Sequence, residues 1–526
     1  MINSENNLTI NFSNENLSIL KFFFNLLTLL CFFIQIFLGE TLEDYYCIII
    51  LVTLNLIVSQ YCFNEKILFL YPISTFIIFC TNISIGGSAL IFKTFFLEPV
   101  TLRLHLPLET FFFLFICIIY LIICHYSYRK INLFYLIKNY FSNILIKLET
   151  KNNFKFNNFI GNFCFLLLIL ISFFLVRAGQ KSFLENIMDG IGVFIAMPLI
   201  FLLFVPIYNE AKQKHYKYYI YITIYMILSF FFSLAVNSRA FFLDKIYLIL
   251  ILLFFFLILG IIKITYRFFF KTLIFFIVAI LIAPILNKYS EGMLSVRDLR
   301  FENINNPTQN IYNFFENTLG KSQIKFIDSN SSTLFKEDYI PSSIIGRINT
   351  IYTTDNLFFA SKYLTSSSVQ KIQDYEKNQI ISLFPEFFIK IFDKDFNKKF
   401  YGENTTASLF YKAVESDYGG PKSVGSMFAT LHIYYNNYFF IYFYPITIVC
   451  FIVGDSFWLK TQRFSNLLFP IFYASAGALT GVFAVSSISV LMNIVFRGIP
   501  QTIILYALLL WLYNLFLKKN TITQQQ

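Results

Sequence analysis

Charged residues are scarce in this sequence. They make up 13% of the 526 residues, whereas 57% are hydrophobic and the mean hydropathy is +0.64. In soluble domains about a quarter of the residues are charged, so this shortage excludes an ordinary soluble protein. The net charge is +11, but the basic residues mostly flank apolar runs, where they set membrane topology. The charge therefore gives no reason to expect a nucleic-acid partner.

Several motifs are also missing. All eight cysteines lie in or beside apolar runs and none lies in the long polar segment 288–430, which argues against a disulfide framework and a cysteine metal site. The chain has no Gly-x-Gly-x-x-Gly motif, no P-loop and no internal repeat, so nothing supports a nucleotide-driven pump. The first apolar run lacks a small-residue cleavage site, which predicts an uncleaved span rather than a signal peptide.

What the sequence does have is a series of long apolar runs. A membrane-crossing helix needs about 20 apolar residues. By that length rule the chain is an all-α polytopic membrane protein with about twelve transmembrane helices. The run 67–92 contains Pro72 and the pair Gly86-Gly87, which predict a kink or a break. The predicted spans are 19–38, 46–63, 67–92, 108–127, 159–176, 190–208, 218–236, 245–262, 272–287, 431–454, 464–486 and 499–517.

These spans divide the chain into five parts. A polar lead, 1–18, precedes a bundle of nine spans, 19–287. A long loop follows at 288–430, then three more spans at 431–517 and a tail at 518–526. Lysine is concentrated in alternate connections, which places both termini in the cytoplasm and the long loop outside. The polar segment 128–158 lies on the inner side and predicts a helix at the membrane surface.

Arginine does not follow this alternation. Seven of the ten arginines fall on the predicted outer side, including Arg177, Arg239, Arg347 and Arg497. Arginine binds phosphate and carboxylate through two hydrogen bonds at once, which lysine does not do. A charge where a span meets the outer connection is costly and is usually functional, although such side chains also snorkel to lipid headgroups. As a group, the outer arginines predict an anion site.

Four short patches carry a resemblance. They are Gly346-Arg347-Ile348-Asn349 followed by the aromatic segment around Pro385; Gly419-Gly420-Pro421 leading to Tyr434-Tyr435-Asn436-Asn437; Asn237-Ser238-Arg239-Ala240; and Phe496-Arg497-Gly498. In these patches, and in its predicted topology, the chain resembles the Wzy-type O-antigen polymerases, or oligosaccharide repeat-unit polymerases. It departs from them where Pro385-Glu386 stands in place of Pro-Arg.

The resemblance implies a helical glycosyltransferase fold of the GT-C type, acting at the periplasmic face of a bacterial inner membrane. It implies transfer of an oligosaccharide from an undecaprenyl-pyrophosphate carrier to a lipid-linked repeat unit, without a metal or other cofactor. A chain-length regulator is a possible further partner. The leaving group is a lipid pyrophosphate, whose developing charge preorganised arginines would stabilise. We expect Arg239 and Arg497 to bind it, with Arg347 closing over the substrate and Arg177 in support.

A general base should activate the acceptor hydroxyl. The sequence offers His432 at the start of a span, and Glu386 and Asp355 in the loop.

Three alternatives remain at this point. A polyprenyl-phosphate-sugar glycosyltransferase would use an acidic pair in the first outer loop, where Glu43-Asp44 stands. A flippase for lipid-linked oligosaccharides fits the number of spans, but not the long loop 288–430. An O-antigen ligase shares the chemistry and differs in its acceptor.

Overall fold

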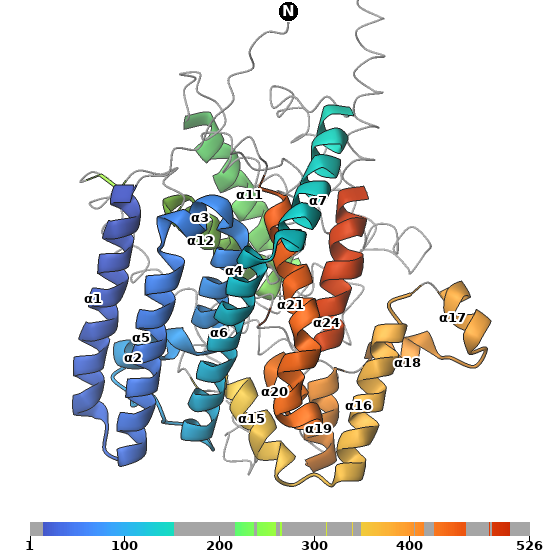
Figure 1. Ribbon diagram of the computed structural model, residues 1–526. Helices are drawn as coiled ribbons and strands as arrows, with labels where there is room; N and C mark the ends of the chain where they lie inside the picture. The colour runs from blue at the N-terminus through green and yellow to red at the C-terminus, as the bar shows by residue number, and fades with distance from the viewer. Residues whose placement is uncertain are drawn as a thin grey trace, which may run out of the picture.

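The computed structural model describes residues 14–151, 216–235, 239–258, 264–265, 349–384, 386–403, 405–414, 425–458 and 487–504, with residues 312, 339 and 483. The regular elements in these ranges are helices (Figure 1). The predicted all-α class is therefore confirmed for the described part of the chain.

Five helical segments in the described ranges are long and apolar enough to cross a membrane: 15–38, 42–62, 72–95, 107–130 and 427–456. They coincide with the predicted spans 19–38, 46–63, 67–92, 108–127 and 431–454. The protein is thus an all-helical membrane protein. Spans 159–176, 190–208 and 272–287 lie outside the described residues, as does 464–486 apart from Phe483, so the total of about twelve stays a prediction.

The N-terminal helices form an antiparallel bundle (Figure 1). Its members are α1 (Asn14–Leu38), α2 (Leu42–Cys62), α3 (Glu65–Leu70), α4 (Pro72–Asn82), α5 (Ser88–Phe95) and α6 (Pro107–Lys130). The connections 39–41 and 96–106 lie at the same end, since the Gln35 side chain donates to the carbonyl of Glu98 and accepts from the N–H of Val100. The chain between α2 and α4 lies at the other end.

The predicted span 67–92 is interrupted twice. Helix α3 ends before Tyr71, and Pro72 begins α4 at a position where its missing N–H costs nothing. A π-helical turn, η1 (Ile83–Gly87), then separates α4 from α5. A Cβ on Gly87 would lie 2.4 Å from Asn82 Nδ2 and 2.5 Å from Asn55 Oδ1. Gly87 is therefore required here by the close approach of two side chains.

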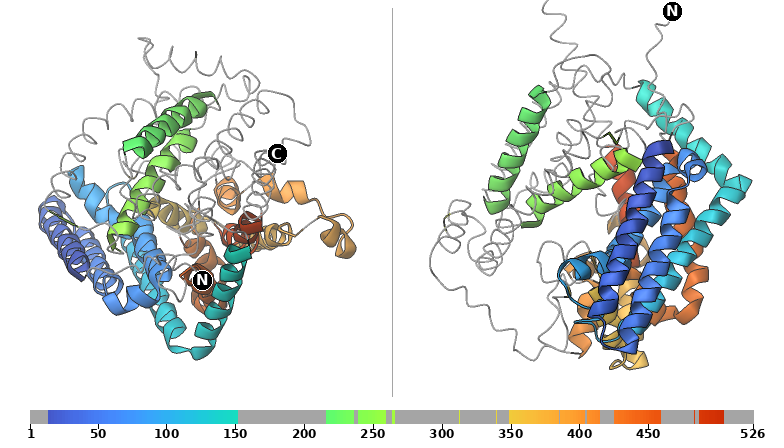
Figure 2. Two further views of the ribbon diagram at one scale, coloured as in Figure 1. Left: turned by 90° about the horizontal axis from the view of Figure 1, so that it is seen from above. Right: turned by 90° about the vertical axis from the view of Figure 1, so that its left-hand side faces the viewer.

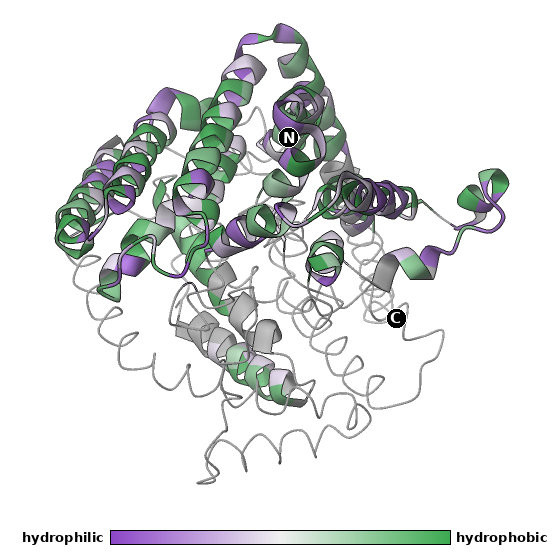
Figure 3. Ribbon diagram, turned by 90° about the horizontal axis from the view of Figure 1, so that it is seen from below, coloured by the Kyte–Doolittle hydropathy of each residue, from purple (hydrophilic) through white to green (hydrophobic). Residues whose placement is uncertain are grey.

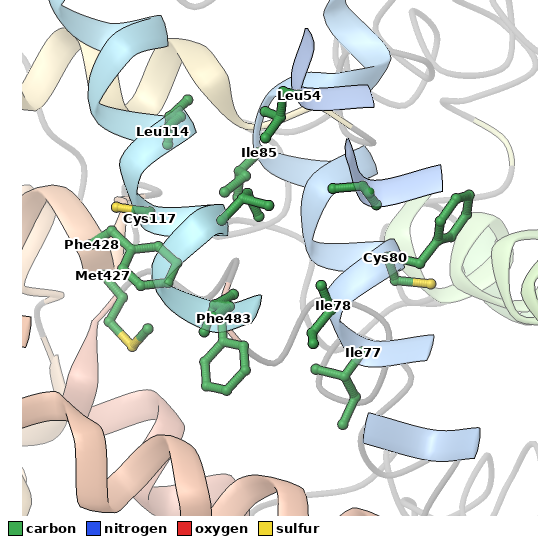
Figure 4. Packing of buried hydrophobic residues seen from close by; sticks show 14 of the residues in the cluster. Leu54, Ile77, Ile78, Cys80, Ile85, Leu114, Cys117, Met427, Phe428 and Phe483 are labelled. Atoms are coloured by element: carbon green, nitrogen blue, oxygen red, sulfur yellow. The ribbon is translucent and has the colours of Figure 1, made fainter. Parts of the chain in front are cut away.

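The core fills the space between these spans with aliphatic, aromatic and sulfur-containing side chains. Figure 4 shows Leu54 of α2, Ile85 of η1, and Leu114 and Cys117 of α6 gathered around one centre. Met427 and Phe428, which follow the long loop in sequence, lie at the side of this cluster. The C-terminal part of the chain is thus packed directly on the first spans.

Five helices form a layer at one end of the bundle, which we call the loop layer. They are α15 (Ile351–Ser361), α16 (Ser366–Ile381), α18 (Lys398–Glu403), α19 (Thr406–Val414) and α20 (Met427–Tyr435). Figure 1 shows the layer at the lower end, with α17 (Glu386–Phe392) projecting away from it. Seen from below in Figure 3, the spans are mostly hydrophobic, whereas the layer carries hydrophilic stretches.

Helix α7 (Asn132–Lys151) lies at the opposite end and packs beside α21 (Phe439–Ser456). Its Leu133, Leu136 and Tyr140 side chains are exposed, as expected of a helix at a membrane surface. The turn η5 (Asn436–Tyr438) joins α20 to α21.

Two further helices, α11 (Tyr216–Ala235) and α12 (Arg239–Ile258), overlap the predicted spans 218–236 and 245–262. They pack against one another at one side of the bundle (Figure 2). Helix α12 is held to α4 by the rings of Phe255 and Phe76, whose centroids are 4.6 Å apart.

The last described helix begins earlier than predicted. Its first part is α24 (Ile488–Met492), and it continues through the π-helical segment η6 (Asn493–Gly498) to residue 504. Arg497 therefore lies inside this helix, and not at the start of a span at 499 as the sequence suggested. The predicted span 499–517 is described only to residue 504.

Candidate functional site

The loop layer is fastened to the bundle at the π-helical turn of the third span. The N–H of Thr350 donates to the carbonyl of Ser84 over 2.8 Å, and Asn349 Nδ2 donates to the Ser88 hydroxyl over 2.9 Å. A π-helical turn interrupts the regular hydrogen-bond ladder of a helix. The carbonyl of Ser84 is thus available to the chain that enters α15, and this contact fixes where α15 begins.

Asp355 is buried on α15 and caps the first turn of α6. Its carboxylate accepts hydrogen bonds from the N–H of His105 at 2.7 Å and the N–H of Leu106 at 2.8 Å, and from the Thr110 hydroxyl at 3.2 Å. Burial raises the pKa of Asp355, while these hydrogen bonds act in the other direction. Both carboxylate oxygens accept hydrogen bonds, so Asp355 connects α15 to the start of α6. Its role as a general base stays a prediction.

His432 lies at the same junction, on α20. Its ring is half-buried against Phe113 of α6, Phe358 of α15 and Phe439 of α21, with centroid distances of 4.9, 5.8 and 6.1 Å. The structure thus brings Asp355 and His432, two of the predicted bases, to the same end of α6.

Glu376 was not among the residues predicted from the sequence. This residue of α16 is only 2% exposed, and its Oε1 accepts from the N–H groups of Ile488 at 2.9 Å and Ser489 at 3.5 Å. Burial raises the pKa of Glu376 to about 7, although the nearby Tyr434 hydroxyl opposes this. Its Oε2 has no well-formed hydrogen bond within the described residues. A carboxyl group with a pKa near neutrality is suited to proton transfer.

The signal for Glu376 was present in the sequence. The side chains of Ile372, Tyr375 and Glu376 are the buried ones of α16, and they follow the spacing of one helix face. An acid on the apolar face of an otherwise polar helix marks a position worth testing.

The same helix holds the start of α24 through a second residue. Gln379 Oε1 accepts from the Ser489 hydroxyl at 3.1 Å and from the Thr406 hydroxyl at 3.3 Å. Helix α16 therefore fixes the position of the helix that carries Arg497.

Arg497 is exposed on η6 and lies near Lys398 of α18. Partial burial lowers the pKa of Lys398, and the positive charge of Arg497 lowers it further. Lys398 Nζ donates to the carbonyl of Phe384 at 2.8 Å. In the part of the chain that the structure describes, Arg497 makes no salt bridge. Lys398 thus lies in the electrostatic range of the Arg497 guanidinium, with the Glu386 carboxylate also near it.

The remaining predicted residues are placed as follows. Glu386 is exposed on α17 and forms an ion pair with Lys390 over 2.6 Å, which lowers its pKa. Arg239 is the first residue of α12, and its side chain lies outside the described part of the structure. Arg177 and Arg347 also lie outside the described residues. The ranges that are described contain no cluster of three His, Cys, Asp or Glu side chains able to hold a metal ion.

The fold and this site define a class of protein. It is a polytopic, helical membrane protein with a buried acid in the loop layer and two basic residues, Lys398 and Arg497, near it. Comparison of the chain with protein-family models, with curated proteins and with solved structures found no match.

Proposed function

We propose that this protein is a glycosyltransferase of the GT-C type that polymerises oligosaccharide repeat units. It would take an oligosaccharide from undecaprenyl pyrophosphate and transfer it to a lipid-linked repeat unit. The loop layer would face the periplasm of a bacterial inner membrane, with both termini in the cytoplasm. The observation that carries this proposal is that Arg497 lies on the helix whose first turn contacts the buried Glu376, with Lys398 of the loop layer nearby.

These two basic residues would supply the charge that the reaction needs. Cleavage of the sugar–pyrophosphate bond leaves negative charge on the phosphate oxygens, and preorganised donors stabilise such charge. Arg497 and Lys398 would bind this leaving group, with Arg239 as a second arginine. The aromatic side chains of Phe388 and Phe392 are exposed on the neighbouring α17, where they would contact lipid.

Glu376 is the candidate base that we favour. It is buried, one of its oxygens has no well-formed bond within the described residues, and its pKa is raised to about 7. Glu386 is exposed and paired with Lys390, and Asp355 is engaged by three donors.

The alternative acidic pair is less well placed. The Asp44 carboxylate accepts hydrogen bonds from the N–H of Thr41 and from the Thr101 hydroxyl, and Glu43 accepts from the N–H of Leu108. These contacts favour a structural use of the pair, in the capping of α2 and α6.

The test is deletion of the gene and complementation with variants, with the surface glycan resolved on a gel. We expect the deletion to lose the long ladder and to keep a single attached repeat unit. Arg497→Ala, Lys398→Ala and Glu376→Gln should each fail to restore the ladder at normal membrane level. Lys390→Ala, which changes an exposed lysine of α17, is the matched control and should restore it.

Other outcomes would replace the proposal. Loss of all surface glycan with carrier-linked full-length polymer would identify a ligase. Single carrier-linked units retained on the inner leaflet would identify a flippase. A normal ladder in both Arg497→Ala and Arg239→Ala would remove the arginine assignments.

A further inference from the structure

A second group of buried polar side chains lies at the end of the bundle opposite to the loop layer. Four residues from four helices form a continuous chain of hydrogen bonds: Tyr61 of α2, His125 of α6, Ser74 of α4 and Asp455 of α21. Ser74, His125 and Asp455 have no measurable exposure, and Tyr61 is half-buried. Ionisable residues inside membrane spans are costly and are usually functional.

The distances show that each neighbouring pair in this group is hydrogen-bonded. Asp455 Oδ1 accepts from the N–H groups of Ile73 and Ser74 at 3.1 and 3.0 Å. The Ser74 hydroxyl lies 2.5 Å from Asp455 Oδ2 and 2.7 Å from His125 Nε2. The Tyr61 hydroxyl lies 2.7 Å from His125 Nδ1. The contact of the Ser74 hydroxyl with the carbonyl of Tyr71 is longer, at 3.4 Å.

A hydroxyl group has one proton to donate. When Asp455 is ionised, Ser74 gives its proton to the carboxylate and must accept one from His125. His125 then carries its proton on Nε2, and the bare Nδ1 accepts from Tyr61. When Asp455 is protonated, every bond reverses: the acid donates to Ser74, Ser74 donates to Nε2, and Nδ1–H donates to the Tyr61 oxygen.

We propose that Tyr61, His125, Ser74 and Asp455 form a proton-binding relay that takes up one proton per chain. Tyr61 passes its proton to Nδ1, His125 passes the Nε2 proton to Ser74, and Ser74 passes its own to Asp455. Tyr61 then takes up a solvated proton (hydronium) from the aqueous phase, since it is the member of the relay that is not fully buried. One proton enters, none leaves, and the negative charge of the Asp455 carboxylate is neutralised. This inference is independent of the glycosyltransferase proposal.

A nearby cation and backbone donors oppose the desolvation of the buried Asp455 carboxylate. Lys138 of α7 lies near Asp455 and donates to the carbonyl of Leu70 at 3.0 Å. Arg129 lies over the Tyr61 ring, 5.5 Å from its centroid, and near His125. Two backbone donors also contact the carboxylate. The other titratable groups facing the relay are Cys62, Tyr71, Tyr128 and Tyr135.

The test uses the full chain in lipid bilayers, labelled with ¹⁵N-histidine, and reads the tautomer of His125 by solid-state NMR. The variant His125→Gln identifies the signal among the four histidines. In the wild type we expect the proton on Nε2. In Asp455→Asn, the amide oxygen keeps the two backbone bonds while the amide N–H donates to Ser74, so the proton should move to Nδ1.

Asp355→Asn is the matched control, because Asp355 also caps a helix but lies at the other end of the bundle; it should leave the His125 tautomer on Nε2. An unchanged tautomer in Asp455→Asn, or an imidazolium ion in either protein, would overturn the relay. If Asp455→Asn does not fold, the same spectrum of the wild type is recorded at acidic pH. The His125 proton should then move from Nε2 to Nδ1. A proton that stays on Nε2, or an imidazolium ion, would overturn the relay.

Discussion

The backbone N–H of Thr350 donates to the carbonyl of Ser84 over 2.8 Å, and this bond joins the long loop to the middle of the third span. The Thr350 hydroxyl also contacts the same carbonyl, at 3.3 Å. The π-helical turn at Ile83–Gly87 makes this carbonyl available. A local irregularity in one membrane helix thus sets the position of a layer that begins more than 250 residues later.

The first prediction concerns the two adjacent glycines of that turn. Gly87→Ala should lower the free energy of unfolding by about 1–3 kcal/mol, because its Cβ would overlap the Asn82 and Asn55 side chains. Gly86→Ala is the control, since its nearest neighbour would be Leu114 at 3.7 Å, an ordinary contact. Thermal unfolding in detergent measures both. Equal melting temperatures for the two variants would contradict this account of Gly87.

The second prediction concerns Asp355. Asp355→Ala should lower the free energy of unfolding by about 3 kcal/mol, because it leaves the N–H groups at the start of α6 without a partner. Asp355→Asn should lose less, since an amide oxygen still accepts. The control Glu109→Gln changes an exposed residue of the same helix that pairs with Lys362, and its effect should be close to zero. If Asp355→Asn stays folded and also makes polymer, Asp355 is not the base.

The third prediction concerns the pH dependence of stability. The ordinary pKa of a glutamic acid is 4.5, and burial raises that of Glu376 to about 7. Between these pH values the folded protein holds a proton that the unfolded chain has lost. Stability should therefore be highest below pH 4.5 and should fall by roughly 3 kcal/mol as the pH rises to 7.

Melting temperatures measured from pH 4.5 to pH 7.5 in the wild type and in Glu376→Gln test this. The amide does not titrate, so the fall assigned to Glu376 should be absent from the curve of the variant and should appear as the difference between the two curves. Two curves that run parallel across this range would show that Glu376 is ionised in the folded protein throughout.

The fourth prediction concerns the two ends of the molecule. Ser366 is exposed at the start of α16, and Asn143 is exposed on α7. With Ser366 in the periplasm, Ser366→Cys should react with an impermeant thiol reagent in intact spheroplasts. Asn143→Cys should react only after permeabilisation. The seven described native cysteines are buried, and the unsubstituted chain serves as the background. Labelling of Asn143→Cys alone in intact cells would invert the proposed topology.

Much of the fold was predictable from the sequence, because hydrocarbon imposes a length rule on any helix that crosses it. Five of the predicted spans coincide with apolar helices in the described ranges. Pro72 and the glycines at 86–87 marked the positions where the third span is interrupted. The site was less predictable. Residue type and position in the chain were enough to select Asp355, Glu386 and His432 as candidate bases. Glu376 and Lys398 were not selected, because both look like ordinary polar residues of a loop.

The sequence by itself determined that this is a helical membrane protein, where five of its described helices lie, and which arginines stand out. These properties follow from the composition of short stretches. Only the tertiary structure decided that Asp355 caps α6, that Glu376 meets the start of α24, and that Asp455 reaches Ser74 and His125. Each of these contacts joins residues far apart in the chain. Such contacts depend on which helix faces pack together. A carboxylate that is buried away from water needs hydrogen-bond donors, and these come from the neighbouring helix.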